Sequence, residues 1–239
     1  MPLKDVSLKV LEQTLKELGD DAIAQHSQRF FKTGKGEYAE GDRFLGIRVP
    51  VLRKLAKRYR KLPMAAVNRL LTSEFHEERQ LALFLLVARF QSSGEADRQK
   101  LYYLYLKHTA FINNWDLVDG SAEHIVGAYL FNRDRKPLYS LVRSDDLWER
   151  RIAILSTYHF IKRNDFADAL KIFEMVLADK EDLIHKAAGW MLREIGKRDI
   201  EAEEIFLKKH YHKMPRTMLR YAIEKFPEEK RQAYLKKTV

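Results

Sequence analysis

Apolar residues recur along this chain with the spacing of α-helices. One face of a helix repeats at positions i, i+3, i+4 and i+7, and this spacing is followed by Leu8, Leu11, Leu15 and Leu18 and again by Phe166, Ala169, Leu170, Phe173, Val176 and Leu177. Residues 81–88 are apolar on all sides, which predicts a helix buried from several directions. No segment shows the strict alternation of a strand. The pattern therefore predicts an all-α protein.

A unit of two helices repeats along the chain. Five apolar helices are predicted to begin at similar four-residue segments that recur every 31 to 36 residues, at 79–82, 115–118, 150–153, 185–188 and 216–219. A second helix fits into the intervals, at 136–142, 166–177 and 200–208. Such a period indicates an α-solenoid, in which each hairpin buries its apolar face against its neighbours. The pattern is nearest to HEAT-type repeats, and stacked hairpins are expected to form a curved, concave surface.

Nothing in the sequence marks a linker. Short polar segments at 92–94, 144–146 and 198–199 separate the predicted helices, and the longest predicted loop covers residues 32–42 with three glycines. We therefore expect one HEAT-like repeat domain over residues 1–239.

Composition narrows the possible functions. The chain holds 44 Lys and Arg against 34 Asp and Glu, a net charge of +10. Because neutralised phosphates release counterions, such a chain gains affinity for polyanions, although a lysine-rich surface is also common in helical proteins with other roles. We expect the concave groove to be basic. The absence of cysteine excludes disulfides and thiolate metal sites.

Targeting signals are not evident either. No stretch approaches the roughly 20 apolar residues of a membrane span, and residues 1–20 lack the apolar region of a signal peptide. We expect a cytoplasmic protein. Common catalytic motifs are missing too: Gly34-Lys35-Gly36 does not match a phosphate-binding loop, and His76-Glu77-Glu78 lacks the second histidine of a zinc-protease helix.

One segment stands out as a candidate site, residues 113–119 with the sequence NNWDLVD. Asn113 can cap the helix, which places Asp116 at the third helical position, near the positive end of the helix dipole. Trp115 and Asp119 are four residues apart and project from one helix face. A carboxylate beside an indole suits a cation. A structural interpretation is also open, in which Trp115 packs in the core and Asp119 pairs with an arginine.

Two later repeats carry residues of matching chemistry. Arg150 and Arg151 lie on the helix predicted at 147–155, and Trp190 lies on the next equivalent helix. These residues have ordinary alternatives, because the arginines can bridge repeats and Trp190 can belong to the core. In a solenoid, however, equivalent helices line one groove. Trp, Asp, Arg and Trp would then come together from three successive repeats. A second basic segment covers residues 53–61.

Together these segments resemble the AlkD-type family of DNA alkylation repair glycosylases, which are built on HEAT-like repeats. The resemblance extends from residue 30 to residue 195 and rests on four segments in order. They are Phe44-Leu45-Gly46-Ile47-Arg48-Val49-Pro50 with Arg53 and Leu55, residues 115–119, Trp148 with Arg151 and residues 153–155, and residues 186–194.

The resemblance implies a monofunctional glycosylase that removes N3- and N7-alkylated purines from duplex DNA in a bacterial cytoplasm. It implies no metal or other cofactor, no obligate protein partner and a monomer. It makes Asp119 the essential carboxylate, puts Trp115 and Trp190 around the deoxyribose, and gives Arg151 a phosphate contact. The family grips backbone and sugar and leaves the base largely uncontacted. A further family aromatic corresponds to Phe30 or Phe31.

Position on the same helices adds further candidates for contacts with the DNA backbone, namely Arg150, Lys186, Arg193 and Arg216. The chemistry suits these residue types. An alkylated purine is already a good leaving group, so a fixed carboxylate that stabilises the oxocarbenium-like sugar is the main requirement.

Two other functions stay open at this point. A DNA-structure-binding protein of the same fold would keep the basic groove without cleavage, and a protein-interaction solenoid would hold an acidic peptide. The carboxylate between two tryptophans favours the glycosylase over the DNA-structure-binding protein. Salt-dependent binding to arbitrary duplex DNA would distinguish these two DNA-binding functions from the protein-interaction solenoid.

Overall fold

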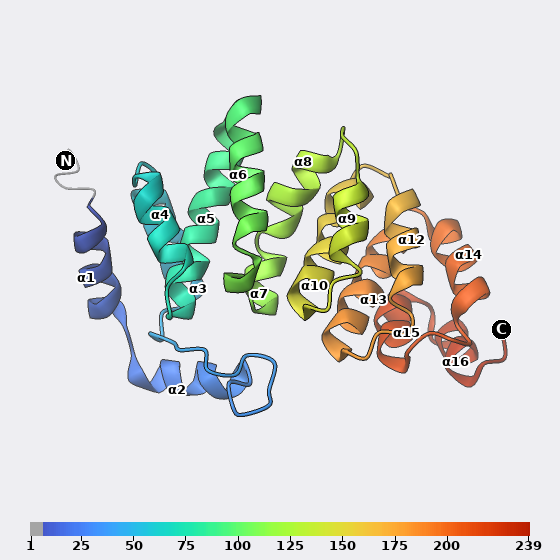
Figure 1. The fold of residues 1–239 in the computed structure, drawn as a ribbon. Coiled ribbons are helices and arrows are strands. Elements are labelled where there is room, and N and C mark those ends of the chain that lie inside the picture. The colour runs from blue at the N-terminus through green and yellow to red at the C-terminus, as the bar shows by residue number, and fades with distance from the viewer. Residues whose placement is uncertain (1–6) are drawn as a thin grey trace. The chain divides into compact units, whose positions relative to one another are not determined.

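The computed structural model describes residues 7–239 and confirms the all-α prediction. Within that range the chain forms helices and turns, and its strand-like pairing is confined to one isolated bridge between Arg43 and Phe75. The chain divides into two compact units, one ending at Ser121 and one running from Ala122 to Val239. Each unit is a stack of helices, and apart from the long loop between α2 and α3 the connections are short (Figure 1).

The helices of the first unit are α1 (Leu8–Leu18), α2 (Asp21–Phe30), α3 (Val49–Arg58), α4 (Met64–Leu71), α5 (His76–Ser92), α6 (Glu95–Lys107), the 3-10 turn η1 (Thr109–Phe111) and α7 (Trp115–Asp119). Those of the second unit are the π-helical turn η2 (Glu123–Gly127), α8 (Ala128–Leu130), α9 (Lys136–Leu141), α10 (Leu147–Ser156), α11 (Tyr158–Ile161), α12 (Ala167–Met175), α13 (Asp182–Gly196), α14 (Ile200–His210), α15 (Arg216–Ala222), the 3-10 turn η3 (Ile223–Lys225) and α16 (Glu228–Lys236).

The repeated hairpins are confirmed. The five predicted first helices correspond to α5, α7, α10, α13 and α15, each of which begins at its expected segment or three residues before it. The predicted second helices correspond to α9, α12 and α14. The connections hold the expected caps, since Asp146 accepts from the amides of Trp148 and Glu149 at the start of α10, and Asp199 accepts from Ala202 at the start of α14.

Helix α5 forms the core of the first unit. Its residues Leu81, Ala82, Leu83, Leu85 and Leu86 are buried, as the all-round apolar pattern predicts. The reason is that α3, α4, α6 and α7 all pack on this helix. Between α2 and α3 the chain is a long loop, as expected for residues 32–42.

Helix α13 has the same central place in the second unit, packed by α10, α12, α14 and α15. Close approach depends on Gly189. A Cβ atom there would lie 2.4 Å from the carbonyl oxygen of Met218 and 2.6 Å from Cβ of Tyr221, both on α15. Because α15 meets the bare backbone of α13, this contact needs glycine.

The helix expected from Trp115 onward differs from the prediction. It ends at Asp119 after five residues, and the chain continues through the π-helical turn η2 into α8. A Cβ atom at Gly127 in this turn would lie 2.2 Å from the carbonyl oxygen of Ser156. The turn therefore packs against α10 at a distance that only glycine allows. No local pattern of residues indicates this interruption, because it depends on packing against a later helix.

Two further expectations concern the whole chain. No helix in residues 7–239 has both the length and the hydropathy of a membrane span. Residues 1–6, part of the segment expected to lack a signal peptide, lie outside the described residues. One domain over residues 1–239, with a concave basic groove, stays a prediction.

A substitution that adds one methyl group at Gly189 tests this contact. Gly189→Ala should lower the free energy of unfolding by roughly 1–3 kcal/mol, because α13 and α15 must separate to admit it. Gly94→Ala is the matched control, since no atom lies within 4 Å of a Cβ there. Urea denaturation of both variants measures the difference, and equal midpoints would contradict the packing described.

Candidate functional site

Helix α7 begins at the candidate residue Trp115 and ends at the candidate residue Asp119. The side-chain oxygen of Asn114 accepts a hydrogen bond from the Trp115 amide at 2.8 Å and caps the helix. The cap is therefore Asn114 and not Asn113, so Asp116 occupies the second helical position and not the third. Both asparagines are suitable caps by residue type, which is why the sequence did not separate them.

Asp116 is tied into the protein by three hydrogen bonds. Its Oδ2 accepts from Nε2 of His76 at 2.8 Å and from Nε2 of Gln80 at 2.9 Å, and its Oδ1 accepts from the Leu117 amide at 2.9 Å. His76 and Gln80 lie near the start of α5. The carboxylate of Asp116 therefore docks the start of α7 onto α5.

His76 lies between two carboxylates. Its Nδ1 is 3.0 Å from Oδ2 of Asp42 and its Nε2 is 2.8 Å from Oδ2 of Asp116. Asp42 also accepts from Nη2 of Arg79 at 2.7 Å. Burial by itself lowers the pKa of His76, but the hydrogen bonds and charges of the two aspartates outweigh it and raise the pKa to about 9. Burial raises the pKa of Asp42, and His76 and Arg79 together bring it below the ordinary value.

Aromatic rings surround this histidine and support Trp115. Phe44 stacks on His76 with ring centroids 4.6 Å apart, and Phe31 lies 5.1 Å from the same imidazole. Phe31 in turn stacks on Trp115 at 5.3 Å and 26°. Phe30 meets Trp115 edge-on at 6.1 Å and is 58% exposed. Both phenylalanines that the sequence left undecided therefore touch Trp115, Phe31 as its support and Phe30 at the surface.

Asp119 lies at the other end of α7 and is half-buried. Its charge reaches the buried Tyr105, whose pKa is raised by burial and, in addition, by Asp119. The hydroxyl groups of Tyr105 and Ser121 are 2.9 Å apart. Asp116 and Asp119 thus have different surroundings, because Asp116 bonds to the buried histidine and Asp119 stands one helical turn away.

The segment from Phe44 to Ile47 wraps around a buried carboxylate. Glu77, 3% exposed, accepts from the amides of Leu45 at 2.8 Å, Gly46 at 2.8 Å and Ile47 at 3.2 Å. Gly46 has φ +81°, and a Cβ atom there would lie 2.0 Å from the carbonyl oxygen of Asp20. This segment therefore shapes the loop that carries Asp42 and Phe44 to His76.

The predicted arginines of the second unit connect its repeats. Arg150 donates through Nε to Asp179 at 2.7 Å and through Nη1 to the carbonyl oxygen of Ser144 at 3.0 Å. Arg151 is 5% exposed and donates to the carbonyl oxygen of Leu183 at 2.5 Å. Both therefore join α10 to the region of α13, the bridging role that the sequence left open beside DNA contact.

Trp190 and its neighbours on α13 also have partners. The Trp190 indole bonds to Glu194, whose pKa is lowered because this bond and the cations Lys197 and Arg198 together outweigh burial. Tyr158 lies 6.2 Å from Trp190, ring to ring. The other two predicted cations of this helix form ion pairs, Lys186 with Asp182 at 2.7 Å and Arg193 with Glu224.

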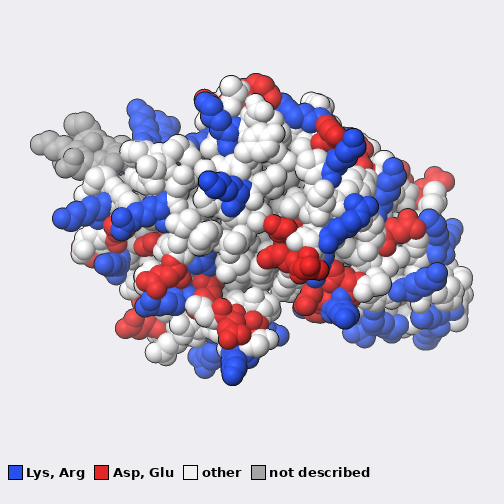
Figure 2. Space-filling model, in the orientation of Figure 1, with Lys and Arg blue, Asp and Glu red and all other residues white. Residues whose placement is uncertain are grey.

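A cluster of exposed cations lies on the first unit. Figure 2 shows basic and acidic side chains interspersed over the face it draws. Helix α3 and the turn after it differ, because no carboxylate pairs with their exposed cations in the part of the chain that the structure describes. We call this set the α3 basic surface, and its members are Arg53, Lys54, Lys57, Arg58, Arg60 and Lys61.

Comparison with known proteins decides the family. The sequence profile described as DNA alkylation repair enzyme matches residues 11–226. The chain belongs to the DNA alkylation repair enzyme family. The confirmed resemblance thus covers nearly the whole chain. No protein among the curated ones matches it.

Solved structures share the fold of this chain. A predicted DNA alkylation repair enzyme from Enterococcus faecalis is 16% identical, with a TM-score of 0.68 over 88% of this chain and 97% of the other. AlkD2 from Streptococcus mutans is also 16% identical, with a TM-score of 0.53 over 92% of this chain and 96% of the other. At such identities the likeness concerns the fold alone.

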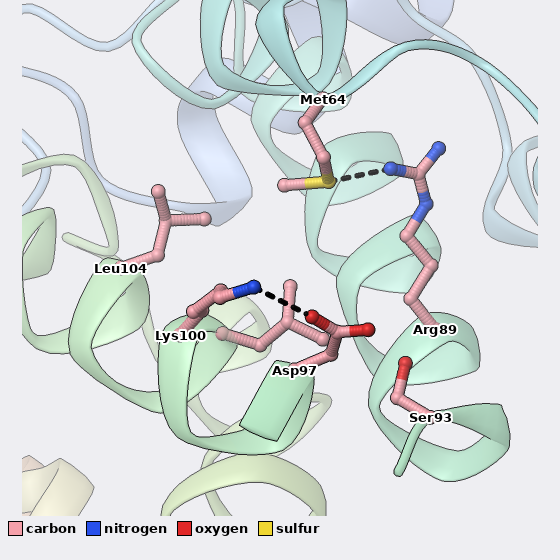
Figure 3. Close-up of a pocket in the computed structure, with 7 residues that line it drawn as sticks. Met64, Arg89, Ser93, Asp97, Lys100 and Leu104 are labelled. Carbon is pink, nitrogen blue, oxygen red and sulfur yellow. Dashed lines mark hydrogen bonds and ion pairs between the residues drawn. The ribbon is translucent and has the colours of Figure 1, made fainter. Parts of the chain in front are cut away.

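A hollow of the first unit lies away from these residues. It measures about 330 Å³ and is formed by α4, α5 and α6 of the first unit (Figure 3). Its lining residues are Met64, Arg89, Ser93, Asp97, Lys100, Leu101 and Leu104. Lys100 pairs with Asp97 at 3.0 Å at its edge. None of the candidate residues borders it, so it is not part of the candidate site.

The structure groups the predicted residues and adds others. Trp115, Asp119, the two phenylalanines and the basic segment 53–61 lie in the first unit, whereas Arg150, Arg151, Lys186, Trp190 and Arg193 lie in the second. The sequence missed His76 and Asp42, because a lone histidine and a loop aspartate carry no motif. Among residues 7–239 no cluster of His, Asp or Glu is arranged to hold a metal ion.

The raised pKa of His76 predicts how stability depends on pH. Its folded pKa is about 9 against an ordinary 6.5, so its stabilisation is full below about pH 6.5, declines as pH rises and is lost above about pH 9. The loss amounts to roughly 3 kcal/mol. We therefore compare the unfolding free energies of wild type and His76→Gln. The difference between them should be about 3 kcal/mol larger at pH 6.5 than at pH 10. The exposed His212→Gln serves as control, and a difference independent of pH would contradict the assignment.

Proposed function

We propose that this member of the DNA alkylation repair enzyme family is a monofunctional DNA glycosylase. It would excise positively charged N3- and N7-alkylated purines from duplex DNA, as a monomeric HEAT-like repeat domain in the bacterial cytoplasm, without metal or other cofactor. The observation that carries the proposal is the arrangement of α7. A short helix held by part-buried hydrogen bonds carries Trp115 and Asp119 four residues apart, the spacing of one helix face.

The chemistry assigned to Asp119 is electrostatic. When the charged purine leaves, the deoxyribose acquires oxocarbenium character, and a fixed carboxylate near C1′ stabilises it and orients the attacking water. Asp116 on the same helix is engaged by His76, Gln80 and the Leu117 amide. For this reason we assign Asp116 a docking role, and we assign the catalytic role to Asp119 because the AlkD-type resemblance implies it.

Trp115 would bind the charged sugar through its ring face. An indole face attracts a cation by roughly 0.5–2 kcal/mol, depending on desolvation. The stack on Phe31 at 5.3 Å fixes the ring, so little side-chain freedom remains to be lost on binding. In the second unit we assign Trp190 the second sugar contact and Arg151 a phosphate contact, as the AlkD-type resemblance implies.

Affinity for the DNA backbone would come mainly from the α3 basic surface. Its exposed cations lack carboxylate partners in the described residues, so phosphates meet no competing acid there. Arg150, Lys186 and Arg193 already pair with Asp179, Asp182 and Glu224. Arg151 donates to the carbonyl oxygen of Leu183. Their contacts with phosphate would require exchange of these partners, so their contribution to affinity should be smaller.

The catalytic assignment is tested by release of free base from duplex DNA that contains N7-methylguanine. Asp119→Asn should lower the single-turnover rate roughly 10²–10³-fold, because it removes the charge that stabilises the sugar cation. Asp97→Asn, at an exposed carboxylate outside the site, should leave the rate unchanged. Duplex affinity should stay the same in both variants.

Other results of this assay separate the alternatives. Release that survives Asp119→Asn would keep the enzyme and remove Asp119 from its centre. No release by wild type, together with salt-sensitive duplex binding, would favour the DNA-structure-binding protein. No duplex binding at all would favour the protein-interaction solenoid.

The α3 basic surface is tested by the salt dependence of binding. The double variant Lys54→Gln/Lys57→Gln should bind undamaged duplex more weakly. Its slope of log K against log salt should become shallower by about 2, because each phosphate that a lysine neutralises adds about 0.9 to that slope. The matched control is Lys100→Gln/Lys136→Gln, which removes two exposed lysines that pair with Asp97 and Asp134. Equal slopes for the two double variants would place the DNA elsewhere.

A further inference from the structure

We propose that His76 is a positioning residue of the glycosylase reaction. As an imidazolium held between Asp42 and Asp116, it fixes the rotation of α7 and thereby the direction of Trp115 and Asp119. This inference rests on the proposed function, but its structural part is testable without the reaction.

The hydrogen bonds around His76 define its state. Both ring nitrogens face carboxylate oxygens, at 3.0 Å for Asp42 and 2.8 Å for Asp116. A carboxylate accepts hydrogen bonds and donates none, so both ring nitrogens must carry hydrogen and the ring is a cation. Arg79 binds the other oxygen of Asp42 at 2.7 Å. The result is a buried chain of alternating charges, two positive and two negative.

No other charged group faces the imidazole among the described residues. Asp42 comes from the loop before α3, Arg79 from α5 itself and Asp116 from α7, while the rings of Phe31 and Phe44 cover its faces. The neighbouring Glu77 is directed to the amides of residues 45–47. The four charges therefore balance one another, and removal of the imidazolium charge leaves two carboxylates to one guanidinium.

Helix α7 depends on this clamp because it is short. It has five residues, and isolated helices shorter than roughly 12 residues are only marginally stable in water. Its first two residues are held from the side of His76. Asp116 bonds to the imidazole, and Trp115 stacks on Phe31, which itself packs on the imidazole at 5.1 Å. The direction of Asp119, one turn further along, follows from that of the first two residues.

The first experiment follows Trp115 as the imidazole titrates. Protein labelled with 5-fluorotryptophan gives resonances from its three tryptophans, and Trp115→Phe identifies that of Trp115 in a ¹⁹F spectrum. The Trp115 resonance of wild type should shift with a midpoint near the His76 pKa of about 9. In His76→Gln it should lose this titration, and the resonance of Trp190 should be unchanged by the substitution. A Trp115 resonance that does not titrate between pH 7.5 and 10 overturns the clamp.

The second experiment connects the clamp to the reaction. In single-turnover excision of N7-methylguanine, His76→Gln should be at least about tenfold slower at pH 7.5, with duplex affinity within about twofold of wild type. The wild-type rate should fall as pH rises through about 9, where the imidazolium is deprotonated, and the variant should lack this alkaline limb. The double variant His76→Gln/Asp116→Asn should recover part of the rate, because a neutral pair replaces the unbalanced carboxylate.

The outcomes for function and for clamp are separable. If wild type releases no base while the Trp115 resonance titrates as expected, the glycosylase function fails and the clamp stands as a structural element of α7. If wild type is active and His76→Gln matches its rate and pH profile, the positioning role is wrong and the function stands.

Discussion

The candidate site depends on one buried chain of charges, from Arg79 through Asp42 and His76 to Asp116. Buried ions are costly unless each is paired and hydrogen-bonded, and here each member meets the opposite charge at 2.7 to 3.0 Å. The four charged residues come from three separate segments, the loop before α3, the start of α5 and the start of α7. These segments are thereby fixed to one another, and a five-residue helix keeps a defined orientation.

The start of α5 explains why sequence reasoning found the repeats but not this network. His76, Glu77, Arg79 and Gln80 are polar and would ordinarily be assigned to solvent, yet none is more than 4% exposed. Each is buried because its partner comes from far along the chain, either residues 42–47 or α7. Periodicity predicted the helices because their apolar faces are local properties. Partners about 30 to 40 residues away leave no local pattern.

Residue identity predicted the conspicuous part of the site for a similar reason. Trp115 and Asp119 share a face through helical spacing alone, so the sequence was enough to pair them. The sequence did not predict that Phe31 supports Trp115, because the position of that ring depends on the loop between α2 and α3. The cap at Asn114 shows the same limit, because two adjacent asparagines offer the same chemistry and only packing selects one.

The two carboxylates of α7 are assigned different roles, one in docking the helix and one in the reaction. Had Asp116 and Asp119 similar surroundings, either would serve as the stabilising charge. Asp116 instead uses its hydrogen-bonding capacity on His76, Gln80 and its own helix, and its negative charge is balanced by the imidazolium. Asp119 lies outside that network and its charge reaches Tyr105; under the proposed function it is the charge that acts on a cation brought to the face of Trp115.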